Sequence, residues 1–349
     1  MALFPFCKTA SGPVRVTRTQ LVLYAFLLSL VVYFLNDRKA AFGVESPRPA
    51  FPASGLDRGG ATTEVTVFKP QTPLETPWGA PLVWGDTPGA ARRRAKFAQR
   101  GVRTGLLALV VGTYARFVRR FLSSAETHFL PGQMVTYYIL TDNPRTLDPP
   151  VELGPKRELR VLPVSELPGW ERLARRRMVL LADAIQNPIV GEEVDYVFCA
   201  DVDQEFVAPV GEEILGELVG TLHPELFGMP RTAFPYEIRE ESAACVKDDE
   251  GDYYYTSELF GGSVAEMYRL ARACSLLILR DQANGLMAGG LEESYLNRYL
   301  ADRRPSRVLS PEYSWWSSAL AADVSVQRLV SLGRTCEARG EQDHNACTN

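Results

Sequence analysis

The sequence predicts an α/β fold built on a doubly wound, mostly parallel sheet. Two observations carry this prediction. Strand-like and helix-like hydrophobic patterns alternate from residue 105 to residue 200, and one buried strand runs directly into two aspartates in the segment VDYVFCADVDQEF (194–206). Alternating strands and helices are typical of sheets covered by helices on both faces. Ligands bind beyond the carboxyl ends of the strands in such sheets.

The elements are expected in a regular order. The run GLLALVV (105–111) predicts a first parallel strand, and apolar residues at helical spacing follow over 114–129. Further strands are expected at 134–140, 159–164 and 194–200, and helices at 173–185, 211–222 and 264–284. Neither G-x-G-x-x-G after the first strand nor G-x-x-x-x-G-K-[ST] is present, which argues against a dinucleotide fold and a P-loop.

The aspartates at the end of the fourth strand are candidate metal ligands. Asp201 and Asp203 follow the apolar residues 194–200. Hard cations such as Mg²⁺ and Mn²⁺ prefer carboxylate oxygens and share their remaining positions with phosphates. The sequence Asp-Val-Asp at a strand end therefore suggests an enzyme that binds a nucleotide diphosphate. A solvated turn after a strand is the alternative interpretation.

Composition excludes other classes of function. The net charge of −4 gives no support for nucleic-acid binding, which requires a basic field. The six cysteines contain no C-x-x-C pair, and three histidines cannot form a histidine-rich metal site. Cys336 and Cys347 could pair in an oxidising lumen. Oxygen ligands are what remain for a metal ion.

The N-terminal part is expected to hold a membrane anchor and a stem. An apolar run without charge begins at Leu21 and ends at Leu35, somewhat short of the ~20 residues that span an average bilayer. The thinner early secretory membranes tolerate a short span, and a cleaved signal peptide is the alternative. We expect a cytosolic tail (1–20), a signal anchor (21–35), a flexible stem rich in Pro and Gly (36–77), a luminal catalytic domain (78–330) and a C-terminal tail (331–349).

Many segments of the chain resemble vertebrate glycosyltransferase family 6, which contains the blood group A and B transferases, the α1,3-galactosyltransferases and Forssman synthase. The matching segments run in family order from residue 76 to about residue 316: TPWGAPLVW, YYILTDNP, VDYVFCADVDQEF, GTLHPELFG, FPYEIR, DEGDYYY, FGGSV, DQANG, EESYLN and RVLSPEYSW. The resemblance implies a sheet of the glycosyltransferase A type in a single-pass type II Golgi membrane enzyme. It also implies transfer of galactose or N-acetylgalactosamine from a UDP-sugar, with retention in α linkage and with Mn²⁺, to a galactose-ended glycan or glycolipid.

The resemblance assigns roles to individual residues. Asp201 and Asp203 would hold Mn²⁺ against the UDP diphosphate, with Val202 nearby, and Glu293 matches the catalytic glutamate. That carboxylate can act as the nucleophile of a double displacement or can steady positive charge while attack and departure occur on one face. Its rival interpretation is a capping charge at a helix start. The remaining donor-site residues would be Leu109, Val110, Val111 and Tyr114 around uracil and ribose, and Arg177, whereas Arg175 and Arg176 are expected on a solvated helix face.

The acceptor side departs from the family pattern. His223 would bind the acceptor, but the segment that sets sugar choice contains a large acid, Glu258, after Thr256 and Ser257. Beside Glu293, this carboxylate would crowd the donor sugar and raise the pKa of one of the two acids. Pro235 replaces an acceptor-contacting threonine or a similar residue found in some relatives, and Trp316 replaces an aspartate. Gly290 and Leu291 stand where relatives carry a tryptophan and usually a histidine. A catalytically silent family member that binds UDP or glycans in the Golgi is therefore an alternative, and a metal-dependent hydrolase on a similar sheet is a more remote one.

Overall fold

The computed structural model describes residues 8–9, 12–13, 73–85, 90–165, 170–186, 193–316, 324 and 326–332. The chain divides into two compact units, Met1–Val67 and Phe68–Asn349. In the first unit, β1 (Lys8–Thr9) pairs antiparallel with β2 (Gly12–Pro13). The expected anchor, most of the stem and nearly all of the tail after residue 331 lie outside the described residues, as do Cys336 and Cys347. Within the described part, no helix combines the length and the apolar character that crossing a membrane requires.

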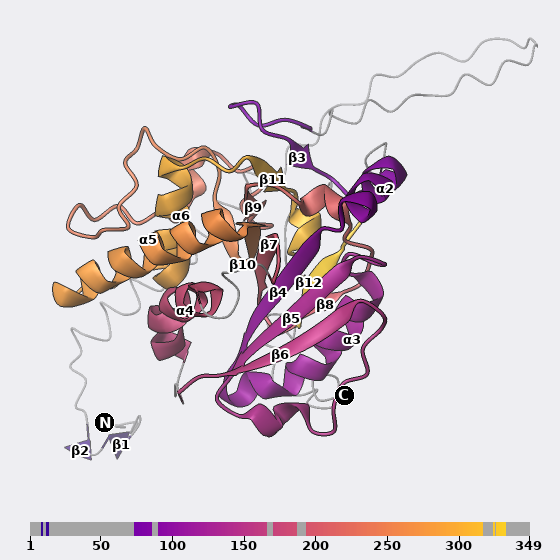
Figure 1. Ribbon diagram of the computed structural model, residues 1–349. Helices are drawn as coiled ribbons and strands as arrows, with labels where there is room; N and C mark the ends of the chain where they lie inside the picture. Colours follow the sequence, from indigo (N-terminus) through magenta and orange to yellow (C-terminus); the bar gives the residue numbers. More distant parts are fainter. Residues whose placement is uncertain are drawn as a thin grey trace, which may run out of the picture. The chain divides into compact units, whose positions relative to one another are not determined.

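The second unit contains an eight-stranded sheet in the order β3-β11-β9-β10-β7-β4-β5-β6 (Figure 1). Seven strands run parallel to one another and β10 alone runs antiparallel to its neighbours β7 and β9. The strands are β3 (Leu82–Val83), β4 (Arg103–Val110), β5 (Met134–Thr141), β6 (Arg157–Pro163), β7 (Tyr196–Ala200), β9 (Leu218–Leu222), β10 (Tyr255–Ser263) and β11 (Arg307–Leu309). The expectation of a mostly parallel sheet is confirmed.

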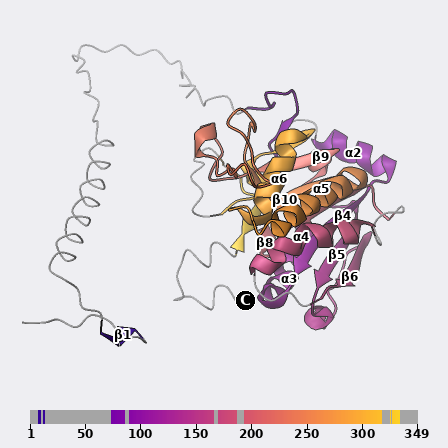
Figure 2. The ribbon, with the colours of Figure 1, turned by 90° about the vertical axis from the view of Figure 1, so that its left-hand side faces the viewer.

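Helices cover both faces of this sheet (Figures 1 and 2). On β4, Leu107 and Leu109 belong to a core cluster with residues of α4 (Trp170–Ala184), α5 (Val264–Ala283) and α6 (Leu291–Asp302). The alternate residues Leu106 and Ala108 belong to the other cluster, with α3 (Val118–His128). Because side chains alternate along a strand, a strand buried on both faces is a continuous apolar run. This is why GLLALVV was recognisable in the sequence.

The expectation of a helix over 211–222 is wrong. The structure has a short 3₁₀ turn, η4 (Glu212–Ile214), and then β9. The apolar residues Ile214, Leu215, Leu218, Val219 and Leu222 fit helical spacing, but all are buried and β9 pairs with β10 and β11 at the same time. A completely buried strand has no polar face, so periodicity cannot distinguish it from a helix.

The strand β10 was not anticipated, although it contains the segment FGGS. At Gly261 an added Cβ would lie 2.3 Å from the ring of Phe198 on the neighbouring strand β7. Glycine therefore allows the close approach of an aromatic ring to the strand backbone, and this requirement masks the strand pattern in the sequence.

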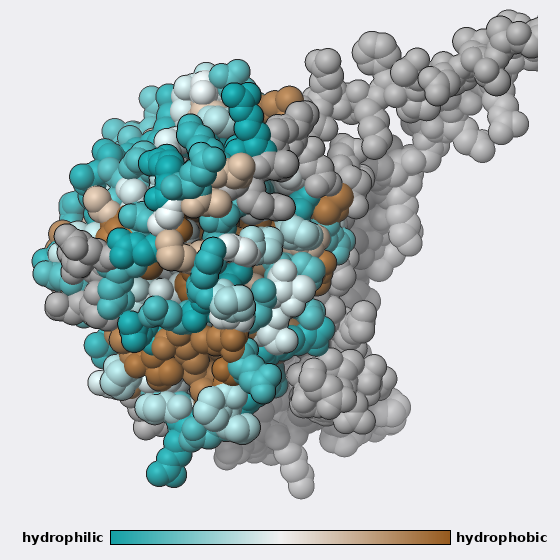
Figure 3. All heavy atoms as spheres, turned by 45° about the vertical axis from the view of Figure 1, so that its right-hand side comes forward, coloured by the Kyte–Doolittle hydropathy of each residue, from teal (hydrophilic) through white to brown (hydrophobic). Residues whose placement is uncertain are grey.

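Smaller elements complete the second unit. The basic segment after residue 90 forms α2 (Ala90–Arg100), and 3₁₀ turn η1 (Gly112–Phe117) leads into α3. A separate two-stranded sheet pairs β8 (Gln204–Phe206) with β12 (Leu329–Ser331), so the end of the described chain lies beside the segment that follows the aspartates. The surface in Figure 3 is mainly hydrophilic, with one hydrophobic area in its lower part.

Candidate active site

Several predicted site residues lie at one edge of the sheet because of the strand directions. The parallel strands β4, β7, β9 and β11 end at this edge, and the antiparallel strand β10 begins there. Val111, Asp201 and His223 directly follow three of those strand ends. Ligand sites of open α/β sheets occupy this position.

The two aspartates follow β7 in a turn. Asp201 and Asp203 are both partly exposed, whereas Val202 between them is only 2% exposed and packs into the core cluster around α3. Backbone contacts fix the turn: the N–H of Asp201 donates to Glu258 O (3.0 Å), and the N–H of Leu332 donates to Asp203 O (2.7 Å). The buried valine holds both carboxylates at the surface of the edge.

Arg177 links three separate parts of the site. Its guanidinium, 3% exposed, contacts Asp201 Oδ1 at 2.6 Å and Glu292 Oε1 at 3.2 Å, and it donates to Ser257 O at 2.9 Å. Burial disfavours the charged guanidinium, but Asp201, Cys199 and Glu292 outweigh that effect and raise the pKa of Arg177. Such forked contacts are the geometry for which arginine is suited.

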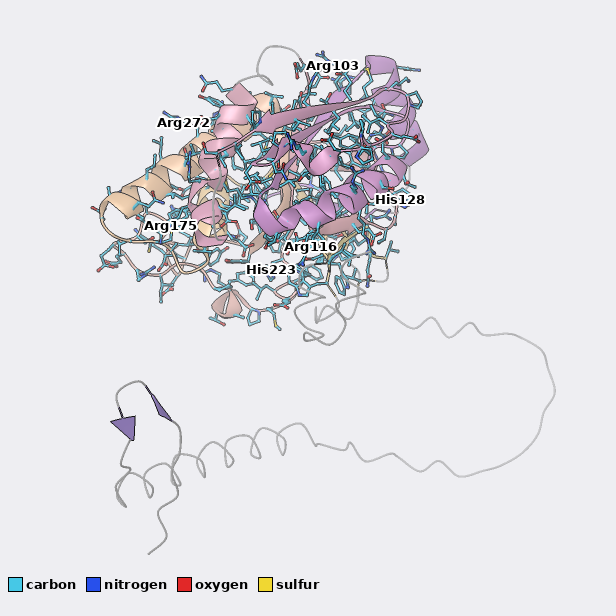
Figure 4. The ribbon with its side chains drawn as sticks, turned by 90° about the horizontal axis from the view of Figure 1, so that it is seen from below. Arg103, Arg116, His128, Arg175, His223 and Arg272 are labelled. Carbon is cyan, nitrogen blue, oxygen red and sulfur yellow. The ribbon has the colours of Figure 1, made fainter. Side chains whose placement is uncertain are left out.

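The other two arginines of the same run behave as expected of a solvated helix face. Arg175 and Arg176 are exposed, while Arg177 is turned into the protein. Figure 4 labels Arg175 on α4. The three adjacent residues differ because each helical position is rotated by about 100° from the one before it.

Glu293 lies in the first turn of α6 and is partly exposed. Its Oε2 accepts a hydrogen bond from the Ser257 N–H at 2.8 Å. The hydroxyl of Tyr254 donates a hydrogen bond to the Glu293 carboxylate. Burial of Tyr254 raises its pKa most, and the charge of Glu293 raises it further. Glu292 and Glu293 both lie at the start of α6, but Glu293 also contacts Ser257 of β10 and Tyr254, the residue before β10. A capping charge alone would not require those partners.

Glu292 is a site residue that sequence reasoning missed. It is 2% exposed and contacts Arg177 from the other side of α6. Adjacent residues on a helix point in different directions, so one acid of the pair faces Arg177 and the other faces Ser257. The only signal in the sequence was the doubled acid at a helix start.

The end of β4 places the predicted uracil and ribose residues at the same edge. Leu109, Val110 and Val111 are buried, and Tyr114 on η1 is partly exposed. Leu109 and Val111 belong to the core cluster around α4–α6, whereas Val110 belongs to the cluster around α3. Val110 therefore points to the opposite face of the strand from the other two. Their role in binding stays a prediction.

The predicted acceptor residue His223, which Figure 4 labels, lies in an aromatic group. The imidazole packs edge-on against Trp316, with ring centres 5.1 Å apart, and against Tyr254 at 5.7 Å. Trp316 is 1% exposed and its Nε1 donates to Glu225 Oε1 at 2.7 Å. Pro235 is exposed, although the residues on each side of it pack against Tyr254.

Glu258 is buried and held by neutral donors. Its Oε2 accepts from Gln204 Nε2 at 3.1 Å and from Ser314 Oγ at 2.8 Å. The side chain of Thr256, also buried, accepts from the Glu258 N–H. The carboxylate thus connects β10 to β8 and to the segment after β11. Its expected effects on the donor sugar and on the pKa of Glu293 stay predictions.

The aspartates fit a partial metal site. Within the described ranges, no group of three or more His, Cys, Asp and Glu side chains is arranged to hold a metal ion. Two partly exposed carboxylates at a strand end leave coordination positions open for phosphate oxygens and water, which Mg²⁺ and Mn²⁺ accept readily. The donor set therefore suits an ion that binds together with a diphosphate.

Comparison with known proteins identifies the family. The sequence profile of glycosyltransferase family 6 matches residues 64–338. Globoside alpha-1,3-N-acetylgalactosaminyltransferase 1 of Homo sapiens is 45% identical over 240 residues, 69% of each chain, and the protein of that name from Gallus gallus is 44% identical over 243 residues, again 69% of each. Histo-blood group ABO system transferase 1 of Rattus norvegicus is 39% identical over 272 residues, 78% of this chain and 75% of the relative. The chain therefore belongs to glycosyltransferase family 6.

Proposed function

We propose that the protein is a retaining, Mn²⁺-dependent glycosyltransferase that moves galactose or N-acetylgalactosamine from a UDP-sugar in α linkage to a galactose-ended glycan or glycolipid. The observation that carries the proposal is that Arg177 contacts both Asp201 and the Ser257 carbonyl, while Glu293 accepts from the N–H of the same serine. Membership of the family supports the reaction class. Relatives named N-acetylgalactosaminyltransferase and, for Homo sapiens, alpha-1,3-galactosyltransferase 2 support the two candidate sugars.

The chain's own groups divide the work of donor binding. Asp201 and Asp203 would hold Mn²⁺, which when bound neutralises the charge that develops on the departing diphosphate. Arg177 keeps Asp201 in place and at the same time holds Glu292, so the position of α6 depends on the position of the metal-binding turn. Leu109, Val111 and Tyr114 would surround the uridine.

Glu293 is the candidate for the retaining step. As a nucleophile, its carboxylate oxygen would form a bond to the anomeric carbon while the bond to UDP breaks, and an acceptor hydroxyl would displace it in a second step, passing its proton to the released phosphate. In the same-face alternative, the carboxylate would only stabilise the positive charge. The hydrogen bonds from Ser257 and Tyr254 would orient the carboxylate in both cases.

The N-terminal sequence supports a proposal for the cellular setting. An apolar segment from Leu21 to Leu35 followed by a Pro- and Gly-rich stem supports a single-pass type II protein of the Golgi membrane with a luminal catalytic domain. Such a tether would bring the site close to membrane-borne glycan acceptors.

A catalytically silent UDP- or glycan-binding protein is the second candidate. The packing of Trp316 against His223 favours it, because a large side chain then lies against the predicted acceptor residue. The transferase and a silent UDP-binding protein both require the donor site, and they differ only in whether sugar is transferred.

Transfer assays separate the two candidates. The full-length chain is incubated with Mn²⁺, UDP-galactose or UDP-N-acetylgalactosamine, and galactose-ended acceptors. The proposal expects an α-linked product that disappears in Glu293→Gln and persists in Glu205→Gln, a matched change at a partly exposed acid that pairs with Arg120. Binding of UDP without transfer or donor hydrolysis would establish the silent alternative, and absence of Mn²⁺-assisted UDP binding would reject both the transferase and a silent UDP-binding protein.

A further inference from the structure

The loop that leads into α6 is held by an ion pair outside the site described so far. Residues 285–290 connect the end of α5 to Glu292 and Glu293, which lie in the first turn of α6. Any displacement of this loop is passed directly to the first turn of the helix. The orientation of Glu293 therefore depends on what fixes the loop.

Glu237 and Arg239 fix the loop through its backbone. Glu237 Oε2 accepts from the Gly289 N–H at 3.0 Å, and Arg239 Nη2 donates to Met287 O at 2.8 Å. The two side chains are joined by Nε–Oε1 (2.9 Å) and Nη2–Oε2 (2.7 Å) contacts. A single ion pair thus binds both the Gly289 N–H and the Met287 carbonyl of the loop.

The carboxylate of Glu237 is suited to this arrangement because it only accepts. Its two oxygens take four donors: the Arg239 N–H, Arg239 Nε and Nη2, and the Gly289 N–H. Glu237 is 7% exposed, although the next residue, Ile238, is 72% exposed. A glutamine would turn an NH₂ group towards one of these donors and could not satisfy all four.

A second acid supports the same loop from α5. Asp281, completely buried, accepts from Ser242 Oγ (2.5 Å), from the Ala243 N–H (2.6 Å) and from the Tyr295 hydroxyl (2.8 Å). The Tyr295 oxygen in turn accepts from the Ala288 N–H at 3.1 Å. Residues 237–243 and the loop are therefore connected by two separate polar groups.

We propose that Glu237, with Arg239, is a positioning residue that sets the place of Glu293 through the 285–290 loop. The inference rests on the proposed transfer activity. Within the part of the chain that the structure describes, Glu237 makes no hydrogen bond or ion pair with the aspartate turn or with Arg177, so its effect would pass through the loop alone. We expect its loss to lower the turnover of the bound complex while donor binding is kept.

The test compares Glu237→Gln and Arg239→Met with Glu266→Gln in the full-length chain. Glu266 is the matched control because it also pairs with arginines (Arg303 and Arg269) and has a lowered pKa, but it lies at the start of α5, away from the loop. We expect both test variants to lose about tenfold in kcat with the donor KM changed by less than twofold, and the control to stay within twofold in both. Hydrogen exchange should accelerate in peptides covering 285–293 in the test variants only.

The outcomes separate this inference from the proposed function. A wild-type chain without transfer activity overturns both. An active wild type in which Glu237→Gln keeps its kcat, or slows no more than Glu266→Gln, overturns the inference alone. Unchanged exchange in 285–293 also overturns it, because the loop would then not depend on the ion pair. Faster exchange spread over other peptides would indicate a general loss of stability and would overturn it as well.

Discussion

Replacing Arg177 by methionine should destabilise the protein more than the same replacement at Arg175 or Arg176. Methionine retains much of the apolar length of the side chain but removes the contacts to Asp201, Glu292 and Ser257 O. Glu292 then becomes a carboxylate only 2% exposed that has lost its guanidinium partner. Breaking a buried ion pair from one side costs about 3–5 kcal/mol, and we expect about 3 kcal/mol because Asp201 retains access to water.

Urea denaturation at pH 7 provides the measurement. Arg176→Met is the control, since Arg176 is exposed one position away, and it should change the free energy of unfolding by less than about 0.5 kcal/mol. The double variant Arg177→Met/Glu292→Gln should recover part of the loss, because the unpaired charge is removed as well. Equal stability of the Arg177 and Arg176 variants, or a double variant that is less stable by the sum of both single losses, would refute the reasoning.

Three further outcomes are expected. Arg239 lowers the pKa of Glu237 from 4.5 to about 2, so the ionised carboxylate stabilises the folded protein fully above pH 4.5 and progressively less as the pH falls towards 2. Because the arginine is exposed, we expect this contribution to be only about 1–2 kcal/mol. The measurement compares the free energies of unfolding of the wild type and Glu237→Gln at pH 7 and at pH 3. Gly261→Ala should cost about 1–3 kcal/mol because the new methyl group meets the Phe198 ring, whereas Gly289→Ala, which meets nothing within 4 Å, should be close to neutral in thermal unfolding. Asp203→Asn should weaken Mn²⁺-assisted UDP binding by at least tenfold in calorimetry; unchanged binding would remove this residue from the metal site.

The first half of the sheet could be predicted because its signals are local. The strands β4, β5 and β7 are continuous apolar runs, and α3 and α5 carry apolar residues at helical spacing. The second half was less predictable. Its strand β9 has the same apolar spacing as a helix, and β10 contains Gly261, where the neighbouring Phe198 ring leaves no room for a side chain. In both segments, pairing with neighbouring strands determined the structure, although the local sequence did not show a strand pattern.

The sequence by itself determined the alternation of strands and helices, the two aspartates at a strand end and the motifs that place the chain in its family. These features are contained within short stretches, where neighbouring residues and their spacing carry the information. Only the tertiary structure decided that Arg177 contacts Glu292 from 115 residues away, that Glu258 is held by Gln204 and Ser314, and that Glu237 supports the start of α6. Such contacts depend on which strands become neighbours, because hydrogen bonds and ion pairs act over a few ångströms in space regardless of separation along the chain.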